Sequence, residues 1–302
     1  MILPYTKKTG LQKRIVTGPP GEKAGPRGLV ILAAAGPGDP DLITVKAANA
    51  LRDADVVLTD RLVSEVILHR YVAPAAKIVR VGKECRSQVS TPQQTINQLI
   101  VKYALQGKKV VRLKGGDVSV FSNVLDELQT LVDNKIPYEI IPGVTAALGA
   151  AAYAGMPLTA RGYATSVRFL TYYKSDIVTD THWQELAQTN DTLVFYMSSG
   201  TLPTLVHKLR ESGISKDVHL AVAEQATTCY QRIHECNIYD YEAHFSNREL
   251  ASPSLVIVGK VVALHQQFKW LKNSDHEEQY FSSVGKENQN INETNKPIKH
   301  VV

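Results

Sequence analysis

Short apolar runs alternate with longer amphipathic segments along the first half of the chain. The apolar runs are residues 29–33, 55–59, 77–81, 109–113 and 138–141. Each run precedes a segment whose apolar positions recur at helical spacing. This alternation predicts strands joined by helices, which is the pattern of a parallel α/β sheet.

Residues 92–106 form the clearest predicted helix. Its apolar side chains fall on one face at helical spacing, and they are Ile96, Leu99, Ile100, Tyr103 and Ala104. Thr91 and Gln94 fit a capping box at its start, and Pro92 suits its first turn. Gly107 can close its C-terminal end. Such well-marked ends support the neighbouring strand assignments.

The second half of the chain continues with further apolar runs, several of them close together. The predicted strands are residues 166–171, 192–197, 219–223, 229–234 and 254–258. With this spacing, a mixed sheet is expected. The predicted fold class is therefore α/β, with an N-terminal lobe built on a parallel sheet and a C-terminal lobe built on a mixed sheet.

A length of 302 residues also favours two packed lobes. We place the boundary near Pro157, so that the N-terminal lobe covers residues 29–156 and the C-terminal lobe residues 157–272. Residues 1–28 are rich in Gly, Pro and Lys, and residues 273–302 are polar. Both of these terminal segments are expected to be flexible tails.

The composition excludes several classes of protein. At 44% hydrophobic and 21% charged residues, the chain is neither disordered throughout nor fibrous. The net charge of +5 lies largely in residues 1–28, and the nearly neutral body disfavours nucleic-acid binding. No run approaches the ~18 apolar residues of a membrane span, and the N-terminus lacks the apolar block of a secretory signal. We therefore expect a cytoplasmic protein without a membrane partner.

Small, polar and charged residues follow each strand of the predicted parallel sheet. These loops are Gly36-Pro-Gly-Asp-Pro-Asp, Asp60-Arg-Leu-Val-Ser, Gly82-Lys83, Lys114-Gly-Gly-Asp117 and Pro142-Gly-Val-Thr-Ala146. Any one of them could be an ordinary structural turn. Ligands of open α/β sheets bind at the carboxyl ends of the strands, however, so five such loops at one edge predict a binding site.

Two common kinds of site are not indicated. Gly36-Pro-Gly38 lacks the third glycine of a dinucleotide fingerprint, and no GxxxxGK[ST] phosphate loop is present. Cys85, Cys229 and Cys236 form no CxxC pair, and His234 lies with Cys236 in a strand-like run. No metal site and no disulfide framework is predicted.

In their order and spacing, these loops resemble the tetrapyrrole methylase family, and within it the uroporphyrinogen-III C-methyltransferases. The resemblance covers about residues 29–262. It also rests on Val81-Gly-Lys83, Val110-Val-Arg-Leu-Lys-Gly-Gly-Asp117, Ala151-Ala-Tyr-Ala-Gly and Pro157-Leu-Thr. It implies a two-domain homodimer that binds S-adenosylmethionine in the cleft between its lobes. It further implies methylation of uroporphyrinogen III at C-2 and C-7 to precorrin-2, for sirohaem or cobalamin.

The same resemblance implies nine contacts with the cofactor S-adenosylmethionine. These residues are Pro37, Gly115, Gly116, Asp117, Val120, Thr145, Ala146, Met197 and Ala226. The carboxylate of Asp117 can meet a cationic amino group or a hydroxyl of the cofactor, and its competing role is that of a helix N-cap. Met197 ends an apolar strand, so ordinary core packing competes with cofactor binding there.

Three residues are expected to act in catalysis. Asp60 matches the family's proton acceptor and Lys83 its proton donor, while Arg161 is a basic group available for the substrate. Without the resemblance, Asp60 and Lys83 would be interpreted as solvated charges or a surface ion pair. An apolar wall around Lys83 would lower its pKa toward neutrality.

The chain departs from the family pattern mainly on the substrate side. The departing positions are Thr59, Glu84, Gln88, Asn123, Asp126, Ala160, Tyr172 and Tyr173. Asn123 stands where an arginine is expected, and Glu84 replaces a basic residue, so contacts to the substrate's carboxylates are reduced. The basic residues that could compensate are Arg86, Arg112, Lys114 and Arg161.

These departures leave two alternatives open. One is a methylase of a different tetrapyrrole, and the other is a cofactor-binding paralogue with weak or no activity. The presence of both Asp60 and Lys83 argues against the second alternative. Methylases of diphthamide or ribosomal RNA share the fold, but they lack the Arg-Leu-Lys-Gly-Gly-Asp run, and the nearly neutral body disfavours RNA.

Overall fold

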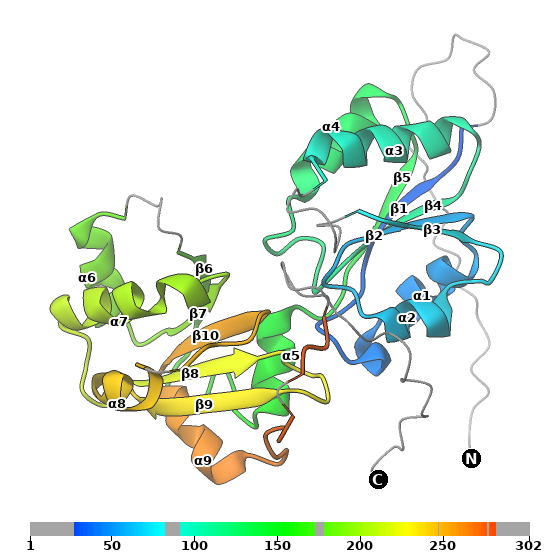
Figure 1. Cartoon of the computed structure of the whole chain (residues 1–302). Coiled ribbons are helices and arrows are strands. Elements are labelled where there is room, and N and C mark those ends of the chain that lie inside the picture. The colour runs from blue at the N-terminus through cyan, green and yellow to red at the C-terminus, as the bar shows by residue number, and fades with distance from the viewer. Residues whose placement is uncertain (1–26, 82–90, 173–177, 247, 277, 282–302) are drawn as a thin grey trace, which may run out of the picture.

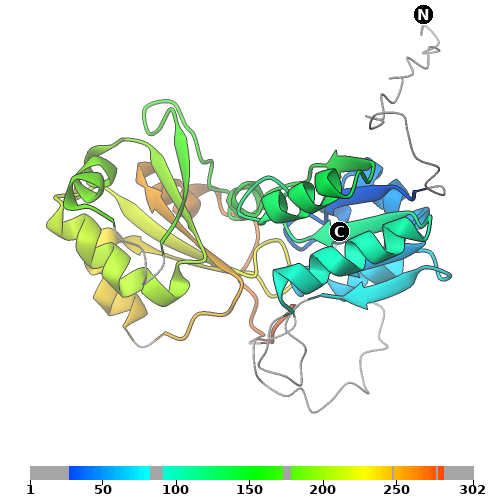
Figure 2. The same ribbon diagram turned by 90° about the horizontal axis from the view of Figure 1, so that it is seen from above.

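The computed structural model describes residues 27–81, 91–172, 178–246, 248–276 and 278–281. These residues form two lobes, each built around a five-stranded sheet (Figure 1). Seen from above, the lobes lie side by side and meet along a narrow junction (Figure 2). None of the described helices is both long and apolar enough to cross a membrane.

The sheet of the N-terminal lobe is parallel throughout, as predicted, with the strand order β3-β2-β4-β1-β5. Its strands are β1 Val30–Ala34, β2 Val56–Thr59, β3 Lys77–Arg80, β4 Val110–Lys114 and β5 Tyr138–Ile141. Parallel strands covered on both faces are apolar along their whole length, which explains the continuous runs in the sequence.

Helices cover both faces of this sheet (Figure 1). They are α1 Val45–Arg52, α2 Glu65–Tyr71, α3 Gln93–Leu105 and α4 Val124–Asp133. Ile31 and Ala33 of β1 pack toward α1 and α2, whereas Val30 and Leu32 pack toward α3 and α4. This alternation holds the sheet between two layers, so the loops at the carboxyl ends of its strands are left for a ligand.

The predicted capping box of α3 is wrong. Pro92 is the N-cap residue and makes no side-chain capping bond, because its ψ of 144° lies outside the helical region and the helix begins at Gln93. The predicted end is correct, since Gly107 has a φ of +77° and its N–H donates to the carbonyl oxygen of Ala104.

The C-terminal sheet is mixed, as predicted, with the strand order β6-β7-β10-β8-β9. Only β6 and β7 pair in parallel, and the other neighbours are antiparallel. The strands are β6 Val167–Thr171, β7 Thr192–Tyr196, β8 His219–Glu224, β9 Arg232–Asn237 and β10 Ser254–Gly259. The strand predicted at 229–234 begins later, at Arg232, because residues 225–230 form the turn that follows β8.

Two groups of helices cover this second sheet. One face packs against α6 Asp180–Gln188, α7 Leu202–Glu211 and α8 Tyr241–Phe245, and the other against α5 Ala146–Tyr153. The remaining helices are α9 His265–Phe268 and the 3-10 turns Pro40–Leu42, Ser199–Thr201, Ile238–Asp240 and Lys260–Leu264. Because α5 shares its core with the second sheet, the change of core comes ahead of α5 rather than at Pro157.

The two terminal segments differ from each other. Residues 1–26 lie outside the described part of the chain. Residues 273–276 and 278–281, which we call the C-terminal strap, were expected to belong to a flexible tail. They instead pack against the body, and Phe281 is only 3% exposed. The ordered body therefore extends beyond the expected end at Lys272.

Candidate functional site

A cavity of about 470 Å³ lies at the junction of the two lobes. Its volume falls within the range of small-molecule sites. All nine of the predicted cofactor residues line it, and they are Pro37, Gly115, Gly116, Asp117, Val120, Thr145, Ala146, Met197 and Ala226. These residues come from five separate loops, which only the fold brings together.

Paired glycines form the N-terminal wall of this cavity. The N–H of Gly36 donates to the carbonyl oxygen of Gly116 at 3.1 Å, and the N–H of Gly116 donates to that of Gly36 at 2.8 Å. Both residues have positive φ, +80° and +70°, a region that side chains disfavour. The bridge joins the loops after β1 and β4, which carry Pro37 and Asp117.

Asp117 is held by backbone groups. One of its carboxylate oxygens accepts from the N–H of Ser119 at 2.7 Å and the other from the N–H of Gly143 at 2.8 Å. The N-cap of α4 is Asn123, so Asp117 does not have that competing role. Because a carboxylate offers about four lone-pair sites, Asp117 keeps acceptor capacity toward the cavity.

The C-terminal wall of the cavity is largely apolar. Met197 follows β7 with a φ of +55° and is 49% exposed, so it does not belong to the core. The hydroxyl of Tyr196 lies 2.7 Å from that of Thr145 and accepts from the N–H of Ala147 at 3.1 Å. These bonds fix the start of α5 against β7, and with it Thr145 and Ala146.

Backbone strain is concentrated around this cavity. Among the described residues other than glycine, six have positive φ, and Phe121, Asn123, Met197, Gln225 and Thr227 lie on loops that line the cavity or flank its lining residues. Such conformations cost roughly 1–3 kcal/mol each and tend to occur at functional sites. The positive φ values are a second feature, independent of the sequence motifs, that points to this cavity as the candidate site.

Asp60 lies directly beside the cavity, since the next two residues, Arg61 and Leu62, line it. One of its carboxylate oxygens accepts from the N–H of Leu62 at 3.1 Å, and the other lies 3.7 Å from the guanidinium of Arg112. Burial raises the pKa of Asp60, against the opposing attraction of Arg112 and Lys114. A carboxyl with a raised pKa is suited to exchange protons.

Behind Asp60, a fully buried carboxylate joins two cations. Glu127 on α4 accepts from Arg112 Nε and from Lys114 Nζ, each at 3.0 Å. Burial lowers the pKa of Lys114, although the charge of Glu127 opposes this. Arg112 and Lys114 were candidates for binding the substrate's carboxylates, and that hypothesis is wrong because Glu127 already occupies both of them.

Of the two remaining catalytic candidates, the structure describes Arg161 but not Lys83. Arg161 is exposed in the turn between the bridge partners Ala160 and Ala164 and is not among the residues that line the cavity. Lys83 lies outside the described residues, and its role stays a prediction. The same is true of Glu84, Arg86, Gln88 and Tyr173.

Eleven of the residues that line the cavity were not among the predicted cofactor contacts, and they include Arg61, Phe121, Tyr196 and Phe281. Arg61 adjoins Asp60 in the chain, so a search of the whole Asp60 loop would have found it. Burial lowers the pKa of Arg61, and the charge of Asp60 opposes this. An arginine remains charged under these conditions, so a cation faces the cavity.

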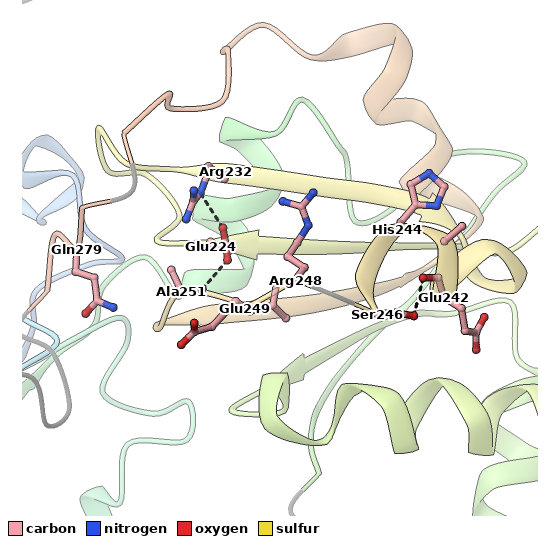
Figure 3. Close-up of a pocket in the computed structure, with 11 residues that line it drawn as sticks. Glu224, Arg232, Glu242, His244, Ser246, Arg248, Glu249, Ala251 and Gln279 are labelled. Carbon is pink, nitrogen blue, oxygen red and sulfur yellow. Dashed lines mark hydrogen bonds and ion pairs between the residues drawn. The ribbon is translucent and has the colours of Figure 1, made fainter.

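A second pocket, of about 600 Å³, lies beside β8 and α8, and polar or charged side chains make up most of its lining (Figure 3). We call it the charged pocket. There, Glu224 accepts from Arg232 Nε at 2.9 Å and from the N–H of Ala251 at 2.5 Å. None of the predicted site residues lines it.

The sequence pattern of the family described as Tetrapyrrole (Corrin/Porphyrin) Methylases matches residues 29–242. A relative named siroheme synthase, from Saccharophagus degradans, is 43% identical over 245 residues, which make up 81% of this chain and 53% of that protein. The chain thus spans about half the length of the curated relatives it matches.

Solved structures agree in fold. A uroporphyrin-III-C-methyltransferase from Thermus thermophilus has a TM-score of 0.67 and 32% identity, with 82% of this chain and 98% of that chain covered. The Thermus thermophilus enzyme complexed with S-adenyl homocysteine has a TM-score of 0.65 and 33% identity, with 78% of this chain and 100% of that chain covered.

Proposed function

This chain belongs to the tetrapyrrole methylase family, and we propose that it transfers methyl groups from S-adenosylmethionine to C-2 and C-7 of uroporphyrinogen III, giving precorrin-2. The relatives named siroheme synthase support the sirohaem branch rather than the cobalamin branch. We propose that the chain acts as a cytoplasmic homodimer, as the family resemblance implies. Sedimentation of the purified protein tests the dimer.

One observation carries this proposal. The nine residues expected to contact the methyl donor come from loops after β1, β4, β5, β7 and β8, yet all of them line the same cavity. Chance would not gather such widely separated positions. The complex of the Thermus thermophilus relative with S-adenyl homocysteine, the demethylated form of the donor, supports the same ligand class.

The reaction needs alignment more than activation, because the methyl group of a sulfonium is already reactive. The cavity walls would align the donor's methyl with the attacking ring carbon, and the held carboxylate of Asp117 would bind the donor's amino group or a hydroxyl. The attacking pyrrole carbon already carries a side chain and no hydrogen, so after methylation a proton must leave from elsewhere on the macrocycle, and Asp60 is its proposed acceptor. Lys83 is the proposed proton donor.

Substrate binding requires cations, since uroporphyrinogen carries eight carboxylates. Arg112 and Lys114 are bound to Glu127 and do not serve this purpose. Arg61 lines the cavity, and Arg161 is exposed on the facing lobe. We propose Arg61 and Arg161 as contacts for the substrate's carboxylates, at roughly 1.5–3 kcal/mol for each charge-assisted bond.

Anaerobic incubation of the purified protein with uroporphyrinogen III and methyl-labelled S-adenosylmethionine tests the proposal. The expected product carries two labelled methyl groups per tetrapyrrole, counted by mass spectrometry. No methyl transfer by protein that binds S-adenosylhomocysteine would contradict the substrate assignment. It would favour a different tetrapyrrole or a paralogue without activity.

A further inference from the structure

Phe281 is the only residue from beyond α9 that lines the junction cavity, among the residues that the structure describes. It lies at the end of the C-terminal strap, which runs from α9 up to the junction of the lobes (orange to red in Figure 1). Only 3% of Phe281 is exposed. Most of the side chain is therefore covered by the protein, and Phe281 is a fixed part of the cavity's boundary.

The strap is anchored to the C-terminal lobe at its start. The side chain of Asn273 accepts from the N–H of Ile233 at 2.8 Å and donates to its carbonyl oxygen at 2.9 Å. The N–H of Ser274 donates to the carbonyl oxygen of Gln231 at 2.9 Å. These bonds extend the edge of the sheet at β9, so the strap leaves the lobe in a defined direction.

Gln225 then clamps the strap close to the cavity. Its amide nitrogen donates to the carbonyl oxygen of Glu278 at 3.0 Å, and its amide oxygen accepts from the N–H of Tyr280 at 2.6 Å. Gln225 is fully buried with the strap in place. The strap supplies both hydrogen-bond partners of its side-chain amide. Gln225 is therefore a specific hydrogen-bond partner of the C-terminal strap.

The end of the strap also reaches the N-terminal lobe. The hydroxyl of Tyr280 donates to the carbonyl oxygen of Gly38 at 3.4 Å, in the loop that carries Pro37. The rings of Tyr280 and Phe281 pack edge to face, with centroids 5.2 Å apart. Gln279, between these contacts, lines the separate charged pocket (Figure 3). The strap thus crosses the junction and directs Phe281 to the cavity.

We propose that Phe281 is a binding residue for the methyl donor and that the C-terminal strap is a fixed wall of the donor site. The cavity keeps about 470 Å³ with Phe281 in place, so the ring bounds the cavity rather than filling it. Its ring shares the cavity with Pro37, Gly116 and Ala226, which are proposed donor contacts. This inference rests on the proposed function for the identity of the ligand.

Calorimetric titration of S-adenosylhomocysteine into the full-length protein tests whether the C-terminal strap is a wall of the donor site. Phe281→Ala should raise the Kd at least about tenfold, because the cavity would lose the side chain that bounds it on this side. Phe268→Ala is the matched control, since that ring is 51% exposed on α9 and outside the cavity, and it should leave the Kd unchanged. Thermal melting of each variant establishes that it is folded.

Hydrogen exchange provides a second measurement on the unaltered chain. Bound S-adenosylhomocysteine should slow exchange of the Tyr280 and Phe281 amides, and Gln225→Leu should speed it and raise the Kd. The proposal that the strap forms a wall of the donor site would be wrong if the Kd of Phe281→Ala stayed within twofold of that of the unaltered protein and the ligand left hydrogen exchange in the strap unchanged. The proposed function would remain intact. Failure of the unaltered protein to bind S-adenosylhomocysteine would instead overturn the donor assignment itself.

Discussion

Asp60 is the residue on which the proposed chemistry depends most. Its side chain is 26% exposed, yet burial raises its pKa despite two nearby cations. Two interactions hold it in one orientation, the N–H of Leu62 and the guanidinium of Arg112. A carboxyl so held can accept a proton from the macrocycle without first moving.

Asp60→Asn should lower kcat for methyl transfer by about 10²-fold or more, the usual contribution of a positioned general base. Because the acceptor must be ionised, the activity of the unaltered enzyme should rise as the pH increases through the pKa of Asp60, which lies above the ordinary 3.8 of an aspartate. This acid limb of the pH profile should disappear in Asp60→Asn. A pH series of initial rates measures both effects.

Asp53→Asn is the matched control, since its carboxylate is 70% exposed and pairs with Lys109 far from the cavity. It should leave both kcat and the acid limb unchanged. If Asp60→Asn kept more than half of the original kcat, the assignment of Asp60 as proton acceptor would be wrong.

At the scale of elements, the contact between β4 and α4 is ionic as well as apolar. Glu127 on α4 receives Arg112 and Lys114 from alternate positions of β4, and all three are almost completely buried. The Arg112 guanidinium also donates to the carbonyl oxygens of Leu58 and Leu113. The same cluster therefore fixes α4 on the sheet and orients Asp60.

Glu127→Gln should destabilise the protein by about 3–5 kcal/mol, because two buried cations would lose their nearest countercharge. Urea unfolding followed by circular dichroism measures this loss. Glu65→Gln removes a similar pair with Arg80 on an exposed surface, and should cost less than about 1 kcal/mol. Equal losses in the two variants would contradict the role given to the buried cluster.

The loops after β2 and β4 touch at Gly115. A Cβ atom there would lie 2.7 Å from Leu62 Cβ and 2.8 Å from the Leu62 carbonyl oxygen, both closer than contact allows. Gly115→Ala should therefore push the two loops apart, destabilise the protein by about 1–3 kcal/mol and weaken binding of S-adenosylhomocysteine. Unfolding and calorimetry measure the two effects.

Gly200→Ala provides the control for that substitution, since nothing lies within 4 Å of the added Cβ and the backbone there has no positive φ. It should alter neither stability nor binding appreciably. Normal ligand affinity in Gly115→Ala would show that the close approach of these loops does not shape the donor site.

At the scale of the whole molecule, several polar contacts join the lobes around the cavity. The N–H of Asp39 donates to Thr227 Oγ1 at 3.1 Å, and Tyr280 reaches Gly38. On the C-terminal side, these contacts start from the turn after β8 and from the strap. Gln225 hydrogen-bonds to both of them. The neighbouring Glu224 is 1% exposed and bonds to Arg232 and Ala251.

Glu224 should make the stability of the molecule depend on pH. Burial opposes its ionisation, but bonds from His234 and from the N–H of Ala251 lower its pKa below the ordinary 4.5. A depressed carboxyl stabilises the fold above its unfolded pKa and loses this contribution as pH falls through the folded value. The unfolding free energy of the unaltered protein should thus fall more steeply below about pH 4.5 than that of Glu224→Gln.

Urea unfolding of the two proteins at a series of pH values between 3 and 7 makes this comparison. At pH 7, Glu224→Gln should be the less stable protein, and the difference should shrink on acidification. Parallel curves over the whole series would contradict a depressed pKa at Glu224.

The sequence allowed prediction of the elements and loops whose pattern is local. Apolar runs identified all ten strands that the described residues form. The residues after the parallel strands indicated where a ligand would bind, since chain direction alone places those ends at one edge. The sequence signals for where a helix begins were less reliable. Thr91 and Gln94 match a capping box in type, but Pro92 is the N-cap and the helix begins at Gln93, so Thr91 is one residue too early to cap it.

What the sequence could not reveal depends on contacts across the fold. Asp126 and Glu127 are adjacent acids, and only the rotation of α4 decides that Glu127 is the buried one. Phe281 lies in a polar segment without periodicity, so nothing local distinguishes it from a tail. Its role depends on Gln225, more than fifty positions earlier in the chain.

A crystal structure of the protein with S-adenosylhomocysteine tests the central claim most directly. We predict that the ligand lies in the junction cavity, in contact with Pro37, Gly116, Ala226 and Phe281. Ligand density in the charged pocket around Arg232, or an empty junction cavity at saturating ligand, would contradict the account.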